Sequence, residues 1–436
     1  MAVNDMAPLS ERVPKKVMWR LIPLLIMIYV LAHLDRVNVS FAGLTMTDDL
    51  GFSAEVFGFG SGIFFFGYLL FEIPSNLILE KVGARRLIAT IMIIWGTVSA
   101  AMALVETPTQ FYVMRFILGV AESGLYPGVI LYLTFWFRQQ ERATAIALFA
   151  QALAIAGLVG SPLSGWILGA ADGLAGMAGW QWLFIFEGLP TVALAFVVLV
   201  IMTDRPQQAN WLSSEERDWL VQQMANEPTP TGDHGHFLKK LINPRVVMLS
   251  LFYALFLGAF AGLMLWVPKT LQLLLPDLSN NAIGWAVGLP YIPFSIGMYL
   301  WGRYSDRVDN RRRVVSMAAV VGATGFLMLP FMQTLLGFEI ALVVLMTGMG
   351  AGFSSYWGLA TITLGPTLAA VGIAVVNSAG ALGSYASVTG LGKLVTSTGS
   401  YDDGYWMLGG AVLLAAVLVH LVPADEAEKQ DDTVLA

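Results

Sequence analysis

The sequence predicts an all-α membrane protein whose twelve transmembrane helices form two pseudo-symmetric six-helix bundles. The chain is 57% hydrophobic and only 12% charged, and its mean hydropathy of +0.69 is far above that of a soluble domain. Apolar runs of about 20 residues, the length that crosses a bilayer, recur twelve times. We place them at 18–43, 55–78, 86–105, 110–136, 143–170, 180–202, 245–272, 280–302, 313–332, 336–360, 366–392 and 404–422.

The basic residues give the predicted orientation. With the N-terminus in the cytoplasm, 20 of the 24 Lys and Arg residues fall on cytoplasmic segments, as the positive-inside rule expects. One long loop joins the halves, and Ser213 with Glu216 fits a capping box that begins a short helix there. The predicted parts are a cytoplasmic N-terminal segment (1–17), a six-helix bundle (18–202), a cytoplasmic linker with a short helix (203–244), a second six-helix bundle (245–422) and a cytoplasmic tail (423–436).

Two motif pairs repeat between the halves at nearly the same offset. The charged loop 80–86 matches 306–312 at an offset of 226 residues, and the Gly-x-x-Gly-Ser motif at 157–161 matches 380–384 at an offset of 223. Chance similarity among glycine-rich helices could explain the second pair, but hardly both pairs. The repetition indicates internal duplication, which is typical of secondary transporters with a site at the repeat interface.

The strongest candidate site lies in the fourth apolar run. Arg115 and Glu122 are seven residues apart, so they share one helix face about 10 Å apart along the axis. A charge at this depth costs at least about 2.5 kcal/mol, and such residues face the protein interior and usually carry ions, protons or substrate. A structural ion pair is the alternative interpretation, and we favour a functional site.

Span 1 carries a second charged group, at Asp35 and Arg36. Adjacent residues point about 100° apart on a helix, so we expect each to find a partner on another helix. Arg36 offers a planar fork for a carboxylate, and a buried Asp35 can bind and release a proton. His33 is a substrate donor or proton participant, or equally a neutral, hydrogen-bonded histidine.

Further polar side chains lie at membrane depth. Tyr68 could offer its hydroxyl to a pocket, whereas we expect Glu72, near the cytoplasmic end of its span, to contact loop arginines. Gln151 and Asn377 are candidates for substrate hydroxyl contacts or for hydrogen bonds between helices. A mid-span position also favours a pocket role for Ser355 and Tyr356. The charged groups therefore lie mostly in the N-terminal half, which suggests anion binding and proton coupling there and recognition of substrate shape in the other half.

Other function classes find little support. Cysteine is absent, and neither a metal-ligand cluster nor a Ser-His-Asp set is evident, so we predict no enzyme, catalytic residue or metal site. A transporter-like receptor or a membrane enzyme is therefore a weaker alternative. The nearest rival to a symporter is an organic anion exchanger of the organic phosphate type, which uses an arginine in each half, but span 7 here has none.

These motifs resemble those of the major facilitator superfamily, and within it the anion:cation symporter family. The similarity covers essentially the whole chain and is closest to the bacterial permeases for sugar acids, tartrate, phthalate and hydroxyphenylacetate. The matching positions are the loops 80–86 and 302–312, Asp35-Arg36, the run 71–76, Arg115 with Gly119, Glu122 and Pro127, and Trp182 with Glu187-Gly188.

The resemblance implies the site roles and the setting. Asp35 and Glu122 would be the proton-coupling acids and Arg36 and Arg115 the anion contacts. By the same similarity Tyr68, Gln151 and Asn377 would line the substrate cavity. From their own positions in the chain we add His33, Ser355 and Tyr356 to the expected substrate site, and we expect gating by Glu80, Arg85, Asp306, Arg307 and Arg311. The expected function is proton-coupled uptake of an organic carboxylate by a monomer in the bacterial cytoplasmic membrane. We expect both termini in the cytoplasm, no cofactor besides the coupling proton, and no nucleic-acid partner.

Overall fold

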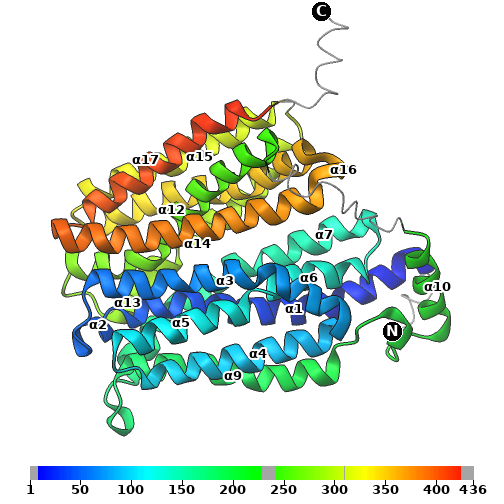
Figure 1. Ribbon diagram of the computed structural model, residues 1–436, viewed down its shortest axis with the longest axis horizontal. Coiled ribbons are helices and arrows are strands. Elements are labelled where there is room, and N and C mark those ends of the chain that lie inside the picture. The colour runs from blue at the N-terminus through cyan, green and yellow to red at the C-terminus, as the bar shows by residue number, and fades with distance from the viewer. Residues whose placement is uncertain (1–7, 228–241, 309, 424–436) are drawn as a thin grey trace, which may run out of the picture.

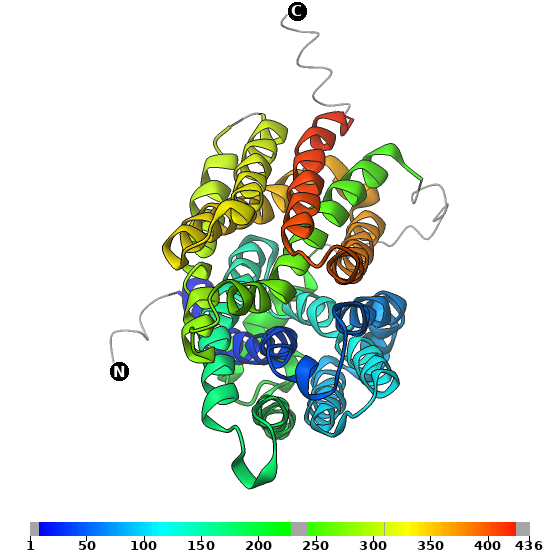
Figure 2. The ribbon, with the colours of Figure 1, turned by 90° about the vertical axis from the view of Figure 1, so that its left-hand side faces the viewer.

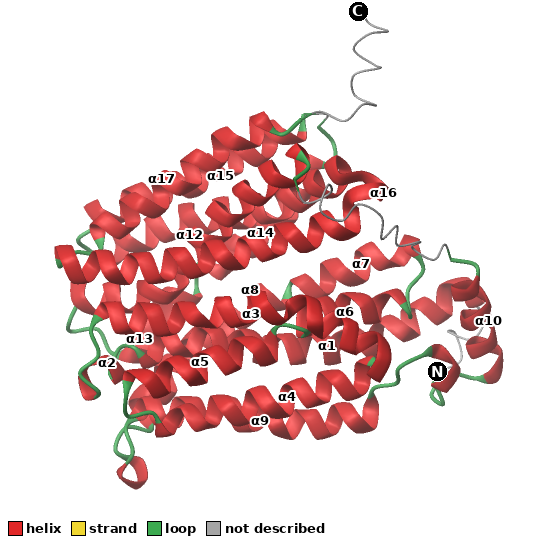
Figure 3. Ribbon diagram, in the orientation of Figure 1, coloured by secondary structure: helices red, strands yellow, loops and turns green. Residues whose placement is uncertain are grey.

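The computed structural model describes residues 8–227, 242–308 and 310–423, and these residues form helices and connections without a strand among them (Figure 3). The helices of the first half are α1 (Leu9–Ala42), α2 (Met46–Asp49), α3 (Ala54–Val82), α4 (Ala84–Ala101), α5 (Pro108–Glu122), α6 (Leu125–Thr134), α7 (Gln139–Ala150), α8 (Ala152–Ala170) and α9 (Gly179–Ile201). After α10 (Ser214–Ala225) come α12 (Pro244–Leu274), α13 (Asn280–Gly288), α14 (Tyr291–Ser305), α15 (Arg311–Met328), α16 (Leu335–Thr398) and α17 (Asp402–Leu418). Short 3₁₀ turns are η2 (Met102–Leu104), η3 (Leu174–Gly176), η4 (Pro206–Gln208), η5 (Leu329–Phe331) and η6 (Val419–Leu421).

The twelve predicted spans are confirmed. Within the described residues, twelve helical stretches are long and apolar enough to cross a membrane. Several spans comprise two helices, such as α5 with α6, whereas the single element α16 contains two spans. The break in α16 is at Gly365, which has φ +58° and ψ 178°. This backbone conformation is essentially restricted to glycine, so Gly365 allows the chain to leave one span and begin the next.

The helices form two bundles, one from α1 to α9 and the other from α12 to α17, which Figure 1 shows as the lower and upper halves. Figure 2 shows the same two groups end-on. The halves pack in related ways: α8 contacts α1 of its own half and α13 of the other, while α16 contacts α12 of its own half and α3 of the other. The repeated glycines lie where helices approach closely, since a Cβ at Gly157 would collide with Tyr291 of α14 in the other half, and one at Gly383 with the backbone of Ala254 in α12.

The two bundles meet tightly at the end of the molecule that carries α2, which we call the α2 end (left in Figure 1). The backbone nitrogen of Glu55 donates to Oγ1 of Thr396 across the halves at 2.9 Å. The Lys269 ammonium donates to the carbonyl oxygen of Leu44 at 3.3 Å. A Cβ at Gly165 of α8 would collide with the backbone of Asn280 in α13. Direct backbone approach and hydrogen bonds therefore hold this end closed.

The opposite end, which we call the α10 end, carries the linker helix α10 packed on the N-terminal half. The predicted capping box is present, because the Glu216 amide donates to Ser213 Oγ at 3.2 Å and the Ser213 amide donates to Glu216 Oε2 at 2.9 Å. The Lys16 ammonium of α1 also donates to Glu216, at 2.7 Å. Burial alone would raise the pKa of Glu216, but the hydrogen bonds from Lys16 and the Ser213 backbone and the nearby positive charges outweigh it and hold that pKa below its ordinary value.

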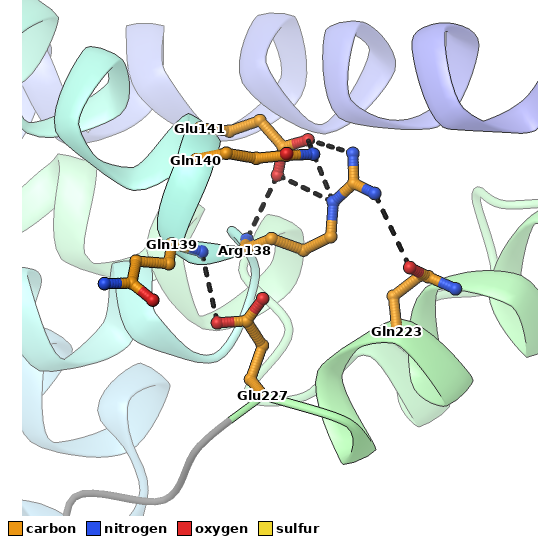
Figure 4. A network of polar contacts seen from close by, with 6 residues as sticks. All are labelled: Arg138, Gln139, Gln140, Glu141, Gln223 and Glu227. Atoms are coloured by element: carbon orange, nitrogen blue, oxygen red, sulfur yellow. Dashed lines mark hydrogen bonds and ion pairs between the residues drawn. The ribbon is translucent and has the colours of Figure 1, made fainter.

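A second polar network joins α10 to the start of α7 (Figure 4). The Arg138 guanidinium donates to the Glu141 carboxylate and, at 3.5 Å, to Oε1 of Gln223 in α10. The backbone nitrogen of Gln139 donates to Glu227 at 3.2 Å. The linker helix is thus attached to the N-terminal bundle at two places.

Candidate functional site

A cavity of about 190 Å³ lies between the two bundles. Its lining from the N-terminal half includes charged and polar side chains, namely Tyr29, His33, Arg36, Ser61, Tyr68 and Arg115. Its lining from the C-terminal half is mainly aromatic and apolar, and includes Tyr253, Phe260, Met264, Tyr291, Phe353 and Trp357, with Asn377 as an amide. The cavity therefore has one wall that can attract an anion and another that fits apolar or ring-shaped surface.

Arg115 is the central charged group of this cavity. The residue is only 2% exposed, and among the described residues its Nε and Nη1 atoms have no hydrogen-bond acceptor. Its Cζ atom lies 4.8 Å from the centre of the Phe64 ring. The ring face attracts the cation, but it is not an acceptor for the in-plane N–H groups of Nε and Nη1. A buried guanidinium with unused donors suits a carboxylate, which can accept charge-assisted hydrogen bonds from it.

Glu122 forms its ion pair with Arg36, and not with Arg115 as in the alternative interpretation of the shared helix face. Nε of Arg36 donates to Oε2 of Glu122 at 2.9 Å, and Glu122 is fully buried. The physical reason is distance, because two turns of α5 separate Glu122 from Arg115, whereas Arg36 reaches it from α1. Arg36 also lies over Phe64, 5.3 Å from the ring centre. Phe64 thus contacts both arginines, and Arg115 remains available.

Asp35 lies on another face of α1 and points away from the cavity. It accepts hydrogen bonds from Nδ2 of Asn38 at 2.7 Å and from the hydroxyl of Ser99 in α4. The residue is 2% exposed and does not line the cavity, whereas its neighbour Arg36 does. The expectation that Asp35 and Arg36 have partners on different helices therefore agrees with the structure.

Glu187 of α9 is a buried acid to which the sequence analysis gave no site role of its own. It is 5% exposed and accepts a hydrogen bond from Ser164 at 2.8 Å, and Asp35 and Asn38 lie close enough to interact with it. The signal was present in the sequence, because Glu187 is the only charged residue in the apolar run 180–202.

The other predicted substrate residues divide into two groups. His33, Tyr68 and Asn377 line the cavity. Ser355 and Tyr356 do not: the hydroxyl of Ser355 donates to the carbonyl of Ala351 at 2.7 Å, and that of Tyr356 to the carbonyl of Leu249 at 2.8 Å. Phe353 and Trp357, one turn apart on α16, face the cavity instead.

Gln151 is also absent from the cavity lining. Its Oε1 accepts a hydrogen bond from the hydroxyl of Ser295 at 2.8 Å, so it joins the two halves beside the cavity. The sequence left two roles open for this amide, a contact with substrate hydroxyl groups or a hydrogen bond between helices, and the structure has the second.

Glu72 departs from its expected contact with loop arginines. Its carboxylate accepts hydrogen bonds from Nδ2 of Asn377 and, at 3.4 Å, from the hydroxyl of Ser378, both on α16. The bond therefore crosses between the halves. Sequence alone could not show this, because Glu72 and Asn377 are 305 residues apart.

The expected gating residues lie at helix ends and in the adjoining loops at the α10 end. Asp306 pairs with Arg311 of its own half at 3.2 Å, and the backbone nitrogen of Arg85 donates to Asp204 at 2.8 Å. Arg307 is exposed, and the side chain of Glu80 lies outside the described residues. Their gating roles stay predictions.

The chain belongs to the major facilitator superfamily, because the family model matches residues 25–388 and, in a second match, residues 273–434. This confirms the predicted superfamily and fold and makes the chain a multi-pass membrane transporter, not an enzyme.

Individual relatives narrow the comparison. A protein of Agrobacterium vitis, provisionally named a tartrate transporter, is 42% identical over 98% of this chain and 94% of its own length. A protein of Acinetobacter baumannii named a quinolone resistance transporter is 36% identical over 98% of both chains. A structure of the xylose transporter XylE from E. coli, in a partially occluded inward-open conformation, superposes with a TM-score of 0.72 over 94% of this chain and 99% of that one. At 14% identity, this last likeness shows the fold alone.

Proposed function

We propose that this chain takes up a small organic carboxylate together with protons. The observation that carries the proposal is Arg115, a buried guanidinium beside the cavity whose Nε and Nη1 have no acceptor among the described residues. A positive charge in a membrane interior is costly, and a substrate carboxylate would offset that cost through charge-assisted hydrogen bonds. The relative named for tartrate supports an organic acid as the substrate.

The cavity volume supports a small substrate. An apolar cavity of about 150 Å³ can hold a benzene molecule, and the cavity here measures about 190 Å³. An organic acid somewhat larger than benzene would therefore fit, with its carboxylate at Arg115 and the rest of the molecule against the C-terminal half.

The distribution of basic residues supports an orientation with the α10 end in the cytoplasm of a bacterial cell. In that orientation the closed α2 end seals the cavity from the outside. Substrate would leave toward the cytoplasm from this conformation and enter after the two bundles rock about the cavity, which is the usual form of alternating access.

The ion pair between Arg36 and Glu122 offers a way to link proton and substrate. While Glu122 is ionised, it occupies Arg36. Protonation of Glu122 would release Arg36, which lines the cavity, to a second acceptor on the substrate. Proton and substrate would then favour each other's binding, and this reciprocity is the thermodynamic basis of symport.

Asp35 would control the conformational change in which the two bundles rock about the cavity. It ties α1 to α4 through Ser99 and does not line the cavity. Protonation of Asp35 would weaken its bonds to Asn38 and Ser99 and change how α1 packs in the bundle, without removing a substrate contact.

The test uses purified protein in vesicles, with substrate uptake driven by an acidic exterior. Glu122→Gln mimics the protonated acid, so it should retain binding and exchange of substrate but lose accumulation driven by the pH gradient. Asp35→Asn should also lose accumulation, while its substrate affinity keeps most of its dependence on pH. Glu106→Gln, an exposed acid just before α5, is the matched control and should behave as the wild type. Accumulation against the gradient by Glu122→Gln would refute this coupling role.

The same vesicles separate symport from anion exchange. Uptake without an internal counter-substrate would indicate symport, whereas an absolute need for one would indicate exchange. We favour symport because both cavity arginines belong to the N-terminal half, and the described lining from the C-terminal half carries no charge.

A further inference from the structure

Glu72 is a buried acid that does not itself line the cavity but bonds Asn377, which does, and the proposed coupling mechanism does not use it. It is 4% exposed and lies on α3. Its two oxygens accept from the Asn377 amide and from the Ser378 hydroxyl, both on α16 of the other half. Within the described part of the chain, Glu72 has no ion pair with a basic residue. The carboxylate therefore depends on these two donors, and Asn377 is held by it.

This contact fixes the direction of the Asn377 amide. An ionised carboxylate only accepts hydrogen bonds, whereas an amide group donates through nitrogen and accepts through oxygen. Asn377 must therefore turn Nδ2 toward Glu72. Its Oδ1 is left as the group that can face a ligand, and within the described residues Oδ1 has no hydrogen-bond donor. Because Asn377 lines the cavity, the C-terminal half presents an acceptor there.

The cavity then has a defined polarity. Arg115 on the N-terminal half offers donors only, which suit a carboxylate. Oδ1 of Asn377 on the other half accepts, so it suits a hydroxyl group and disfavours a second carboxylate. We propose that Glu72 is a positioning residue that holds Asn377 with its carbonyl oxygen toward the cavity, so that the site selects carboxylates that also carry hydroxyl groups. This inference rests on the proposed uptake of a carboxylate.

Tartrate and succinate test the selection directly, because they share the same carbon chain and both carboxylates and differ only in hydroxyl groups. Binding to purified protein is measured by calorimetry. The wild type should bind tartrate at least about tenfold more tightly than succinate, since a site that hydrogen-bonds a hydroxyl group leaves a polar group unpaired with the analogue that lacks it. Glu72→Gln offers either a donor or an acceptor to Asn377, so it no longer fixes the direction of the amide. The ratio of the succinate Kd to the tartrate Kd should therefore fall toward one, mainly through weaker tartrate binding.

Two variants keep the test decisive. Ser378→Ala removes the other donor to Glu72 without touching the amide and should retain the preference. Asn377→Ala should abolish the preference with little change in succinate binding, and it provides the result if Glu72→Gln does not fold. An unchanged preference in Glu72→Gln, or in Asn377→Ala, would overturn the inference while carboxylate uptake still stands. Equal binding of the two acids by the wild type would do the same, whereas binding of neither acid would overturn the proposed function as well.

Discussion

The two walls of the cavity differ more than the two bundles that form them. The bundles are related by their repeated glycine motifs and by matching contacts, α8 with α13 and α16 with α3. The N-terminal wall nevertheless carries Arg36 and Arg115, whereas the described C-terminal wall is aromatic, apolar and uncharged. Packing constrains the helix contacts in both halves equally, but the cavity side chains are free to diverge. In the proposed transport mechanism, the duplicated bundles therefore provide the rocking movement, and the two unlike walls provide the groups that bind the substrate.

The largest effect should come from changing the charged wall. Arg115→Lys keeps the charge but loses the planar fork that binds both carboxylate oxygens. We expect the rate of uptake to fall at least about a hundredfold while expression is unchanged. This fall corresponds to a loss of about 2.7 kcal/mol in transition-state stabilisation, because each factor of ten in rate is about 1.36 kcal/mol. The control is Arg142→Lys, because Arg142 does not line the cavity: it donates to the backbone oxygen of Phe137 and pairs with Glu227 at 4.0 Å. Uptake by Arg115→Lys at the wild-type rate would remove Arg115 from the anion site.

A smaller effect should come from the glycine contacts that the two halves share. A Cβ at Gly165 would collide with the backbone of Asn280, whereas one at Gly169, a turn later on α8, would meet nothing within 4 Å. Overpacking costs about 1–3 kcal/mol, so Gly165→Ala should shift the protein toward conformations open at the α2 end by about five- to 150-fold. Gly169→Ala should have no effect.

The chain contains no cysteine, which makes this shift measurable with one introduced thiol. Ser61 lines the cavity and is 2% exposed, so Ser61→Cys should react slowly with a membrane-impermeant maleimide. Adding Gly165→Ala should increase the rate of labelling from the α2 side. Equal rates with Gly165→Ala and Gly169→Ala would show that this contact does not control access.

The smallest effect should be at the linker helix, outside the cavity. The pKa of Glu216 is below its ordinary value in the folded protein. Its contribution to α10 docking is therefore complete at neutral pH and is lost as the pH falls through and below the ordinary carboxylate range near 4.3. The protection of the α10 amides, measured relative to their intrinsic exchange rate at each pH, should fall as the pH drops across that range. Glu216→Gln should lower this protection already at neutral pH, by about 1 kcal/mol or less. Glu215→Gln, an exposed neighbour, should match the wild type, and equal exchange in both variants would contradict the role of Glu216.

Sequence patterns predicted the fold more completely than the site. Twelve apolar runs and the linker capping box depend on local composition and spacing, so they could be located without coordinates. The charged residues could also be identified as unusual, because their burial costs free energy wherever they lie. Their partners could not, since Arg36 meets Glu122, and Glu72 meets Asn377, only through packing of helices distant in sequence. The predictions for Ser355 and Tyr356 were wrong because their hydroxyls bond backbone oxygens: that of Ser355 bonds Ala351 on its own helix, and that of Tyr356 bonds Leu249 on α12.

The attachment of α10 has a practical consequence for imaging this small protein. Lys16 of α1 and the network around Arg138 hold α10 on the N-terminal bundle. A rigid fusion or a bound antibody fragment on the exposed side of α10 should therefore move as one body with that bundle. Such a fiducial mark would allow particle images to be aligned on the N-terminal bundle, which contains Arg115. The position of the C-terminal bundle in each class of images would then give the angle between the two bundles.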